Sequence, residues 1–175
     1  MCVDHFTSEA EEIVLAAGRM AKEHVFSADV EEIKPFGGIV TRADKEIEAF
    51  VIDSLKRRFP GHGFDSEERG KENAGAEYVW VLDPIDGTRY YAGGVPLYAI
   101  SLALAHKQAR KRKLILGIVH APELGQTYCA VSGRGGPLAS GACPAEVAGM
   151  DEVAPSPAHA IVLSIRALTG GGFTL

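Results

Sequence analysis

Apolar residues recur at helical spacing in two stretches near the N-terminus. The first stretch, residues 8–25, has acidic residues before its apolar stripe and basic residues after it, an order that suits the helix dipole. The second stretch, residues 43–59, is followed by Pro60 and Gly61, which end it. We predict an amphipathic helix in each, with a loop or small hairpin at residues 35–38. The predicted buried stripes are Ile13, Ala16, Ala17, Met20 and Ala21, and then Ile47, Phe50, Val51 and Leu55.

After Gly63 the pattern changes to short apolar runs that predict strands. The first run, residues 78–82, is apolar almost throughout and rich in β-formers, so we expect both of its faces to be buried. Further strands are predicted at residues 98–105, 114–119 and 126–131. The basic segment 106–113 could bind a phosphate-rich ligand, but a solvated hairpin turn between two strands is the better interpretation.

The last part of the chain differs in composition from the rest. Residues 133–157 are rich in Gly, Pro, Ala and Ser, which predicts a loop or linker, and residues 160–165 are one more candidate strand. We therefore expect an α/β domain at residues 1–140. Residues 141–175 are expected to be a linker and the truncated beginning of a second domain.

Composition narrows the possible partners and the compartment. The net charge of −5 argues against nucleic acid or an anionic membrane as the main partner, and no apolar segment is long enough to span a bilayer. The spacings of Cys2, Cys129 and Cys143 suit neither a disulfide framework nor a zinc site. With no secretory signal visible, we predict a cytoplasmic protein in a reducing compartment.

The stretch Asp-Pro-Ile-Asp-Gly-Thr at residues 83–88 directly follows the first predicted strand. Asp83 and Asp86 can converge on one small volume if the chain turns between them, and the carbonyl of Ile85 is a plausible third oxygen ligand. Gly87 lets the chain pass close to a ligand. Thr88 can begin a helix whose free amides face an anion.

A second acidic pair, Glu67 and Glu68, precedes the same strand. Carboxylates that gather in one place repel each other without a cation, and an all-oxygen site favours Mg²⁺ or Mn²⁺ over zinc. Adjacent glutamates are usually a solvated surface, and Asp and Gly are common in ordinary turns. Taken together and in this order, these simpler interpretations are weaker than a metal site.

Thr41 and Asp44 stand at the start of the second predicted helix. Their spacing is that of a capping box, with Thr41 as the N-cap and Asp44 at the third helical position. Taken alone, capping explains this pair better than catalysis does.

The three elements together resemble the signature of the lithium-sensitive, inositol monophosphatase-like phosphatases. The resemblance implies a layered α/β/α/β/α fold that hydrolyses small phosphomonoesters with Mg²⁺. It implies that Glu67, Asp83 and the Ile85 carbonyl bind a first metal ion, that Asp83 and Asp86 bind a second, and that Glu67 helps to hold a third. Thr88 and Asp44 would orient the attacking water, and the Gly87 and Thr88 amides would hold the phosphate. Glu68 is a possible additional ligand.

Two departures from that family qualify the expectation. The family's Trp-Asp motif, whose aspartate completes the second metal site, is absent, so we expect this chain alone to have impaired activity. The alternative is an inactive truncated domain that retains partial metal binding or acts as a dimerising module. Arg89 after Thr88 resembles the histidinol-phosphate phosphatases, which leaves inositol monophosphate, histidinol phosphate or a nucleotide 3′-phosphate as the substrate. Relatives are usually homodimers, and a homodimer is expected here.

Overall fold

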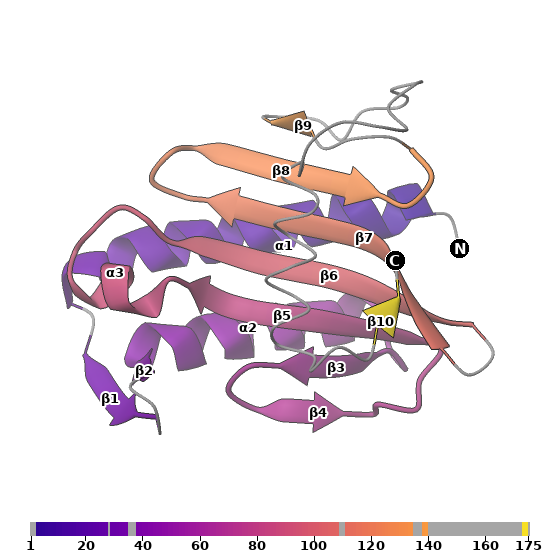
Figure 1. Ribbon diagram of the computed structural model, residues 1–175, viewed down its shortest axis with the longest axis horizontal. Coiled ribbons are helices and arrows are strands. Elements are labelled where there is room, and N and C mark those ends of the chain that lie inside the picture. Colours follow the sequence, from indigo (N-terminus) through magenta and orange to yellow (C-terminus); the bar gives the residue numbers. More distant parts are fainter. Residues whose placement is uncertain are drawn as a thin grey trace.

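The computed structural model describes residues 3–27, 29–34, 38–108, 111–134, 138–139 and 173–174. One sheet of eight strands carries α1 and α2 on the same face (Figure 1). The predicted strand at 160–165 and most of the predicted linker lie outside the described residues. No helix in the described ranges is long and apolar enough to cross a membrane.

The two predicted helices are present. Helix α1 spans Val3–His24 and α2 spans Arg42–Arg58. The first begins earlier than predicted because its apolar stripe continues back through Phe6 and Ala10, which are buried. In the second, Ile47, Val51 and Leu55 are fully buried, whereas Phe50 is only partly buried. A short 3-10 turn, η1 at Val25–Ser27, follows α1.

A two-stranded hairpin stands between the helices, as the Pro-Gly cluster predicted. Strand β1 covers Val30–Ile33 and β2 covers Ile39–Thr41, and they pair antiparallel. Residues 35–37 lie outside the described residues. All four residues of β1 are exposed, so this hairpin contributes little to the core.

The main sheet has the order β4-β3-β5-β6-β7-β8-β9, with β10 pairing β7. Strands β3 and β5 are parallel, and the pairs β5–β6, β6–β7, β7–β8, β8–β9 and β3–β4 are antiparallel. The bounds are β3 Gly63–Ser66, β4 Gly70–Glu72, β5 Tyr78–Asp86, β6 Ala99–Gln108, β7 Lys111–Ala121, β8 Gln126–Val131, β9 Leu138–Ala139 and β10 Phe173–Thr174.

Three of the four predicted strands are longer than the sequence suggested. Strands β6 and β7 continue into the basic segment, where Gln108 pairs with Lys111, so the hairpin is confirmed and residues 109–110 lie outside the described residues. Arg112 helps to extend the hairpin because its guanidinium donates to the carbonyls of Ala74 and Ala76 at 2.6 and 2.8 Å. Strand β8 matches its predicted bounds.

Strand β5 corrects one expectation about the motif. We expected the chain to turn between Asp83 and Asp86, but β5 continues to Asp86 and the turn comes at Gly87. Between these residues the pairing with β6 is irregular, since Asp83 pairs with Ser101 and Asp86 with Ala99. The extra residue forms a bulge, which suits Pro84 because proline has no N–H to give to the ladder. Pro84 and Ile85 are both buried, and this anchors the bulge.

The core lies between the sheet and the two helices. Trp80, Leu82, Ile100, Leu102 and Leu104 from β5 and β6 pack there against the apolar stripes of α1 and α2. The short helix α3, Thr88–Ala92, sits at the end of β5, at the same end of the sheet as the β1–β2 hairpin (Figure 1). The carboxyl end of β5 is therefore where elements from several parts of the chain meet.

Candidate active site

Asp83 lies at the carboxyl end of β5 and is almost fully buried. Its side chain is 6% exposed, and its Oδ1 atom has no hydrogen-bond partner. Burial, and then the nearby carboxylates of Glu67, Asp86 and Asp44, raises the pKa of Asp83 to about 9. A buried oxygen without a partner among like charges is costly, and a cation would reverse that cost.

Glu67 lies close to Asp83 because β3 runs parallel to β5, and Glu68 follows it. Ser66 pairs with Leu82, and the Glu67 amide donates to the Leu82 carbonyl at 3.2 Å. The predicted gathering of the two acidic motifs is therefore present. Glu68 is the more buried of the two, with 11% of its side chain exposed against 30% for Glu67.

Lys34, which no motif in the sequence marks, lies against both glutamates. Its ammonium donates to Glu67 Oε1 and to Glu68 Oε1, each at 2.8 Å. Burial lowers the pKa of Lys34, but the hydrogen bonds and charges of the two carboxylates outweigh it and raise that pKa overall. In this structure Lys34 supplies one positive charge, which the two carboxylates share.

Thr41 and Asp44 form the predicted capping box at the start of α2. The Thr41 hydroxyl and amide both donate to Asp44 Oδ2, at 2.6 and 2.8 Å, and the Asp44 amide donates back to Thr41 Oγ1 at 3.4 Å. Burial raises the pKa of Asp44, and the hydrogen bonds from Thr41 oppose the shift. Capping occupies one carboxylate oxygen, which leaves the other free for a second contact.

Thr88 makes that second contact from the start of α3. Its hydroxyl lies 3.4 Å from Asp44 Oδ1 and 2.9 Å from the Ile85 carbonyl. A hydroxyl has one proton to donate, so the shorter contact with Ile85 takes it here. The structure thus brings together Asp44, Ile85 and Thr88, all of which were predicted site residues.

Gly87 makes the turn that starts α3. Its φ is 93°, in the left-handed region, and a Cβ there would come 2.8 Å from the Leu97 carbonyl. Tyr91 fastens α3 to α1, because its hydroxyl is buried and donates to the Ala21 carbonyl at 2.8 Å. Through Tyr91 the end of β5 is connected to α1, and through Thr88 it is connected to α2.

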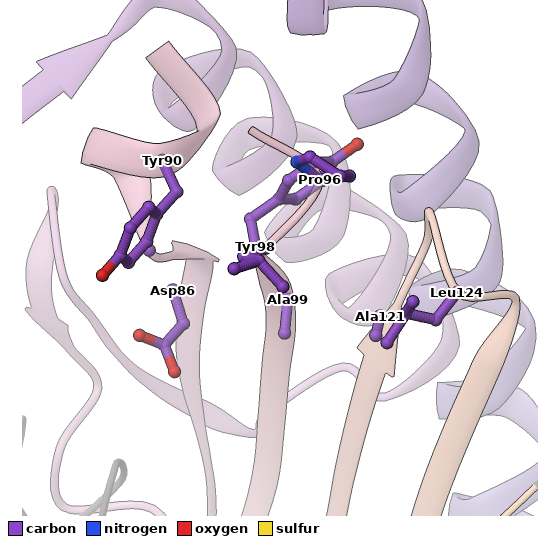
Figure 2. A pocket seen from close by; sticks show the side chains of 9 residues that line it. Asp86, Tyr90, Pro96, Tyr98, Ala99, Ala121 and Leu124 are labelled. Carbon is purple, nitrogen blue, oxygen red and sulfur yellow. The ribbon is translucent and has the colours of Figure 1, made fainter. Parts of the chain in front are cut away.

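A pocket of about 320 Å³ opens beside Asp86 and Gly87 (Figure 2). Most of its lining is apolar, and three of its large side chains are more than half exposed: Tyr90 at 55%, Leu97 at 58% and Leu124 at 60%. At its edge the Tyr98 hydroxyl donates to Glu123 Oε1 at 2.8 Å. The lining residues are Asp86, Gly87, Tyr90, Pro96, Leu97, Tyr98, Ala99, Ala121 and Leu124.

Whether these residues fit a divalent cation depends on their donors. Within the described ranges, no three His, Cys, Asp or Glu side chains are already arranged to enclose an ion. The available donors are nonetheless all oxygens, as Mg²⁺ prefers, and the buried Asp83 Oδ1 is unpartnered. The residues fit Mg²⁺, provided that Lys34 releases Glu67.

Sequence reasoning missed Lys34 and a second residue, Glu48, whose side chain is fully buried on α2 beside the Glu67–Glu68 loop. For Lys34 no local signal existed, since it lies 33 residues from Glu67 in the chain. For Glu48 there was one. A glutamate directly after Ile47, on the apolar side of an amphipathic helix, is out of place unless it has a buried partner.

The layered α/β fold is of the sugar-phosphatase type, as the family resemblance implied. The chain belongs to the inositol monophosphatase family, whose model matches residues 3–164.

The chain is also similar to individual relatives over part of their length. A protein named putative Nus factor SuhB from Neisseria meningitidis is 40% identical over 103 residues, which is 58% of this chain and 38% of that protein. A protein named histidinol-phosphatase from Chlorobaculum parvum is 38% identical over 96 residues, covering 55% of this chain and 36% of its own length.

Solved structures share the fold. The Thermotoga maritima IMPase superposes with a TM-score of 0.68 at 30% identity, covering 80% of this chain and 52% of that one. An inositol monophosphatase from Anabaena gives a TM-score of 0.64 at 30% identity, covering 78% and 47%. The chain spans about half the length, or less, of these relatives.

Proposed function

We propose that this chain carries the metal-binding and phosphate-binding part of a Mg²⁺-dependent phosphomonoesterase. The observation that supports this best is Asp83, a buried carboxylate with an unpartnered oxygen and three other carboxylates close enough to raise its pKa. Residues 1–140 would supply this part, and residues 141–175 a linker and the beginning of a second domain.

The ligands would be those that the family resemblance implies. Glu67, Asp83 and the Ile85 carbonyl would hold one Mg²⁺, Asp83 and Asp86 a second, and Glu67 a third, with Glu68 as a possible additional ligand. Bound Mg²⁺ would supply the positive charge that activates a water and stabilises the departing alkoxide.

Thr88 and Asp44 would orient the water. Once the Ile85 carbonyl serves as a ligand, the Thr88 proton would turn to Asp44 Oδ1, 3.4 Å away. Thr88 Oγ1 would then accept a hydrogen bond from the water, and Asp44 would be the proton acceptor at the end of that chain. Capping by Thr41 fixes Asp44 for this role. The Gly87 and Thr88 amides would hold the phosphate.

The pocket beside Asp86 supports a substrate with a flat, partly apolar leaving group. The exposed ring of Tyr90 and the side chains of Leu97 and Leu124 offer packing surface but few hydrogen bonds. Histidinol phosphate, which carries an aromatic ring, suits such a lining better than inositol monophosphate, whose leaving group is a polyol. A nucleotide 3′-phosphate is the third candidate.

Three broader expectations belong to this proposal. We propose a homodimer, for which light scattering is the measurement, and a cytoplasmic location, for which fractionation of expressing cells is. The proposed substrate is a small phosphorylated metabolite. Because the chain has a net charge of −5, we propose neither nucleic acid nor a membrane as a main partner.

The test is Mg²⁺ binding by calorimetry, with a phosphate-release assay on the three candidate esters alongside. Asp83→Asn should abolish binding while the protein stays folded, because the change removes a repelled, buried carboxyl. Asp53→Asn, an exposed aspartate on α2, is the matched control and should bind as the parent does.

Each outcome has a distinct meaning. Binding that is lost in Asp83→Asn with little turnover would support an intact first metal site in an impaired enzyme. Binding with robust turnover would mean that the absent carboxylate comes from elsewhere, such as a partner subunit. No binding by the parent chain would overturn the metal-site proposal and leave the inactive module as the remaining interpretation.

A further inference from the structure

Glu48 is a buried carboxylate. It lies on α2, one helical turn after Asp44, and its side chain is 1% exposed. Transferring a charged group from water into such a place is costly unless its oxygens gain hydrogen bonds in return. The position therefore calls for a compensating contact.

Both compensating contacts come from one loop. Glu48 Oε1 accepts from the Glu68 amide at 3.0 Å and from the Arg69 amide at 3.2 Å. Glu48 Oε2 lies 3.4 Å from Arg69 Nε but has no hydrogen bond. The Arg69 side chain is 52% exposed, so this ion pair contributes little, and the two amides are the main compensation.

These contacts determine how the acidic loop is held. The Glu67 amide donates to the Leu82 carbonyl of β5, and the Glu68 and Arg69 amides donate to Glu48. Three successive N–H groups are thus fixed to the body of the protein. The Glu67 and Glu68 carboxylates both accept hydrogen bonds from Lys34.

We infer that Glu48 is a positioning residue, which holds the Glu67–Glu68 loop at the geometry that cation binding requires without itself being a ligand. This inference rests on the proposed function for its consequence, because it assumes that Glu67 serves as a metal ligand. Its structural part, the fixing of the loop, stands apart from that assumption. Partners that orient metal ligands in this way typically change metal affinity by about 10- to 100-fold when removed.

Two variants test whether Glu48 acts through its hydrogen bonds to the loop or only by filling space in the core. Glu48→Met fills a similar volume but accepts no hydrogen bond from the amides. Glu48→Gln keeps a carbonyl oxygen for both amides, loses the charge and places an NH2 group where Oε2 faces Arg69 Nε. Ser54→Ala, at another buried polar position on α2, is the matched control.

The first readout is amide hydrogen exchange with NMR chemical shifts, which needs no activity. In the parent chain the Glu68 and Arg69 amides should exchange slowly although they lie in a turn. Both should exchange at least about tenfold faster in Glu48→Met, and stay protected in Glu48→Gln and Ser54→Ala. Rapid exchange of both amides in the parent would overturn the inference even if no variant folded.

The second readout is calorimetry with Mg²⁺ alone. Affinity should fall about tenfold or more in Glu48→Met and return to within about threefold of the parent in Glu48→Gln. Unchanged affinity in a folded Glu48→Met chain with a freed loop would overturn the positioning role. If the parent binds no Mg²⁺, the proposed function fails instead, the consequence for cation binding fails with it, and the exchange data alone decide whether Glu48 fixes the loop.

Discussion

Gly87 shows how much a single backbone conformation can matter at this site. Its φ of 93° already disfavours any side chain, and an added Cβ would also meet the Leu97 carbonyl at 2.8 Å. Gly94 has a comparable φ of 68°, but a Cβ there would meet nothing within 4 Å. The two glycines therefore separate backbone strain from steric overlap.

We predict that Gly94→Ala costs about 1 kcal/mol of unfolding free energy, from the left-handed conformation alone. Gly87→Ala should cost about 1–3 kcal/mol more, because the overlap with backbone is added to the strain. It should also displace Asp86 and Thr88, and so lower metal binding. Urea unfolding of both variants is the measurement, and equal losses would show that the contact with Leu97 is unimportant.

At this scale the sequence indicated the candidate site residues better than the residues that hold them in place. Asp83, Asp86 and Thr88 could be found because they are neighbours in a short motif. Asp44 was found through its capping spacing, although the sequence could not show that its second oxygen faces Thr88 across 44 residues of chain. Lys34 was invisible, because only the folded hairpin carries it to the two glutamates.

The packing of α1 on β7 depends on a glycine within the helix. A Cβ on Gly18 would overlap the ring of His120 and approach Pro122 Cγ at 3.3 Å. His120 has little room to move, since it is 7% exposed and its Nδ1 lies 2.9 Å from the Thr127 hydroxyl. Glycine is otherwise a poor residue for a helix interior.

We predict that Gly18→Ala destabilises the protein by about 1–3 kcal/mol, although alanine is the better helix former by about 1 kcal/mol. In a His120→Ala background the same substitution should be neutral or stabilising, because the overlap is gone. Denaturant unfolding of the four proteins in this double-mutant cycle gives the coupling between the two sites. A coupling near zero would contradict close packing of α1 on β7.

At the scale of elements, periodicity located the helices and strands but not their ends. The run 78–82 predicted a buried strand, yet nothing in alternation alone shows that β5 continues through a proline to Asp86. The bulge depends on pairing with β6, which is a contact between distant segments. Strand β4 has two exposed residues and no apolar run, and so gave no signal.

At the scale of the whole molecule, a group of aromatic and histidine rings packs at the end of the sheet opposite α3. The His62 ring lies between those of Phe59 and Tyr78, with centroids 5.3 and 5.1 Å away. Its Nδ1 faces the indole Nε1 of Trp80 at 3.1 Å. An indole N–H can only donate, so Nδ1 accepts and the neutral ring keeps its proton on Nε2.

We predict that the protein loses stability as the pH falls below about 6.5, the ordinary histidine pKa. Burial lowers the pKa of His62, against an opposing effect of Glu77, and burial also lowers that of His120. Below the ordinary pKa, the unfolded chain binds more protons than the folded chain does. The stability that is present above about pH 6.5 is therefore lost as the pH falls through the lowered pKa values of the two histidines. His62→Phe should remove part of this dependence.

The measurement is urea unfolding of the parent and of His62→Phe at pH 7.5 and pH 5.5. At pH 7.5 the variant should be less stable by about 1 kcal/mol, through loss of the Trp80 hydrogen bond. The gap should narrow at pH 5.5. A gap that stays constant would mean that His62 does not titrate in this range.

Helix α2 contacts two parts of the candidate site, Thr88 and the Glu67–Glu68 loop. Asp44 meets Thr88 on the β5 side, and Glu48, one turn later, meets the loop that carries Glu67 and Glu68. A tilt or slide of α2 would move Asp44 and Glu48 together, and would therefore disturb the contact with Thr88 and the contact with the loop at the same time. Changes in the apolar stripe of α2 are therefore expected to affect both contacts at once, although neither contact belongs to the core.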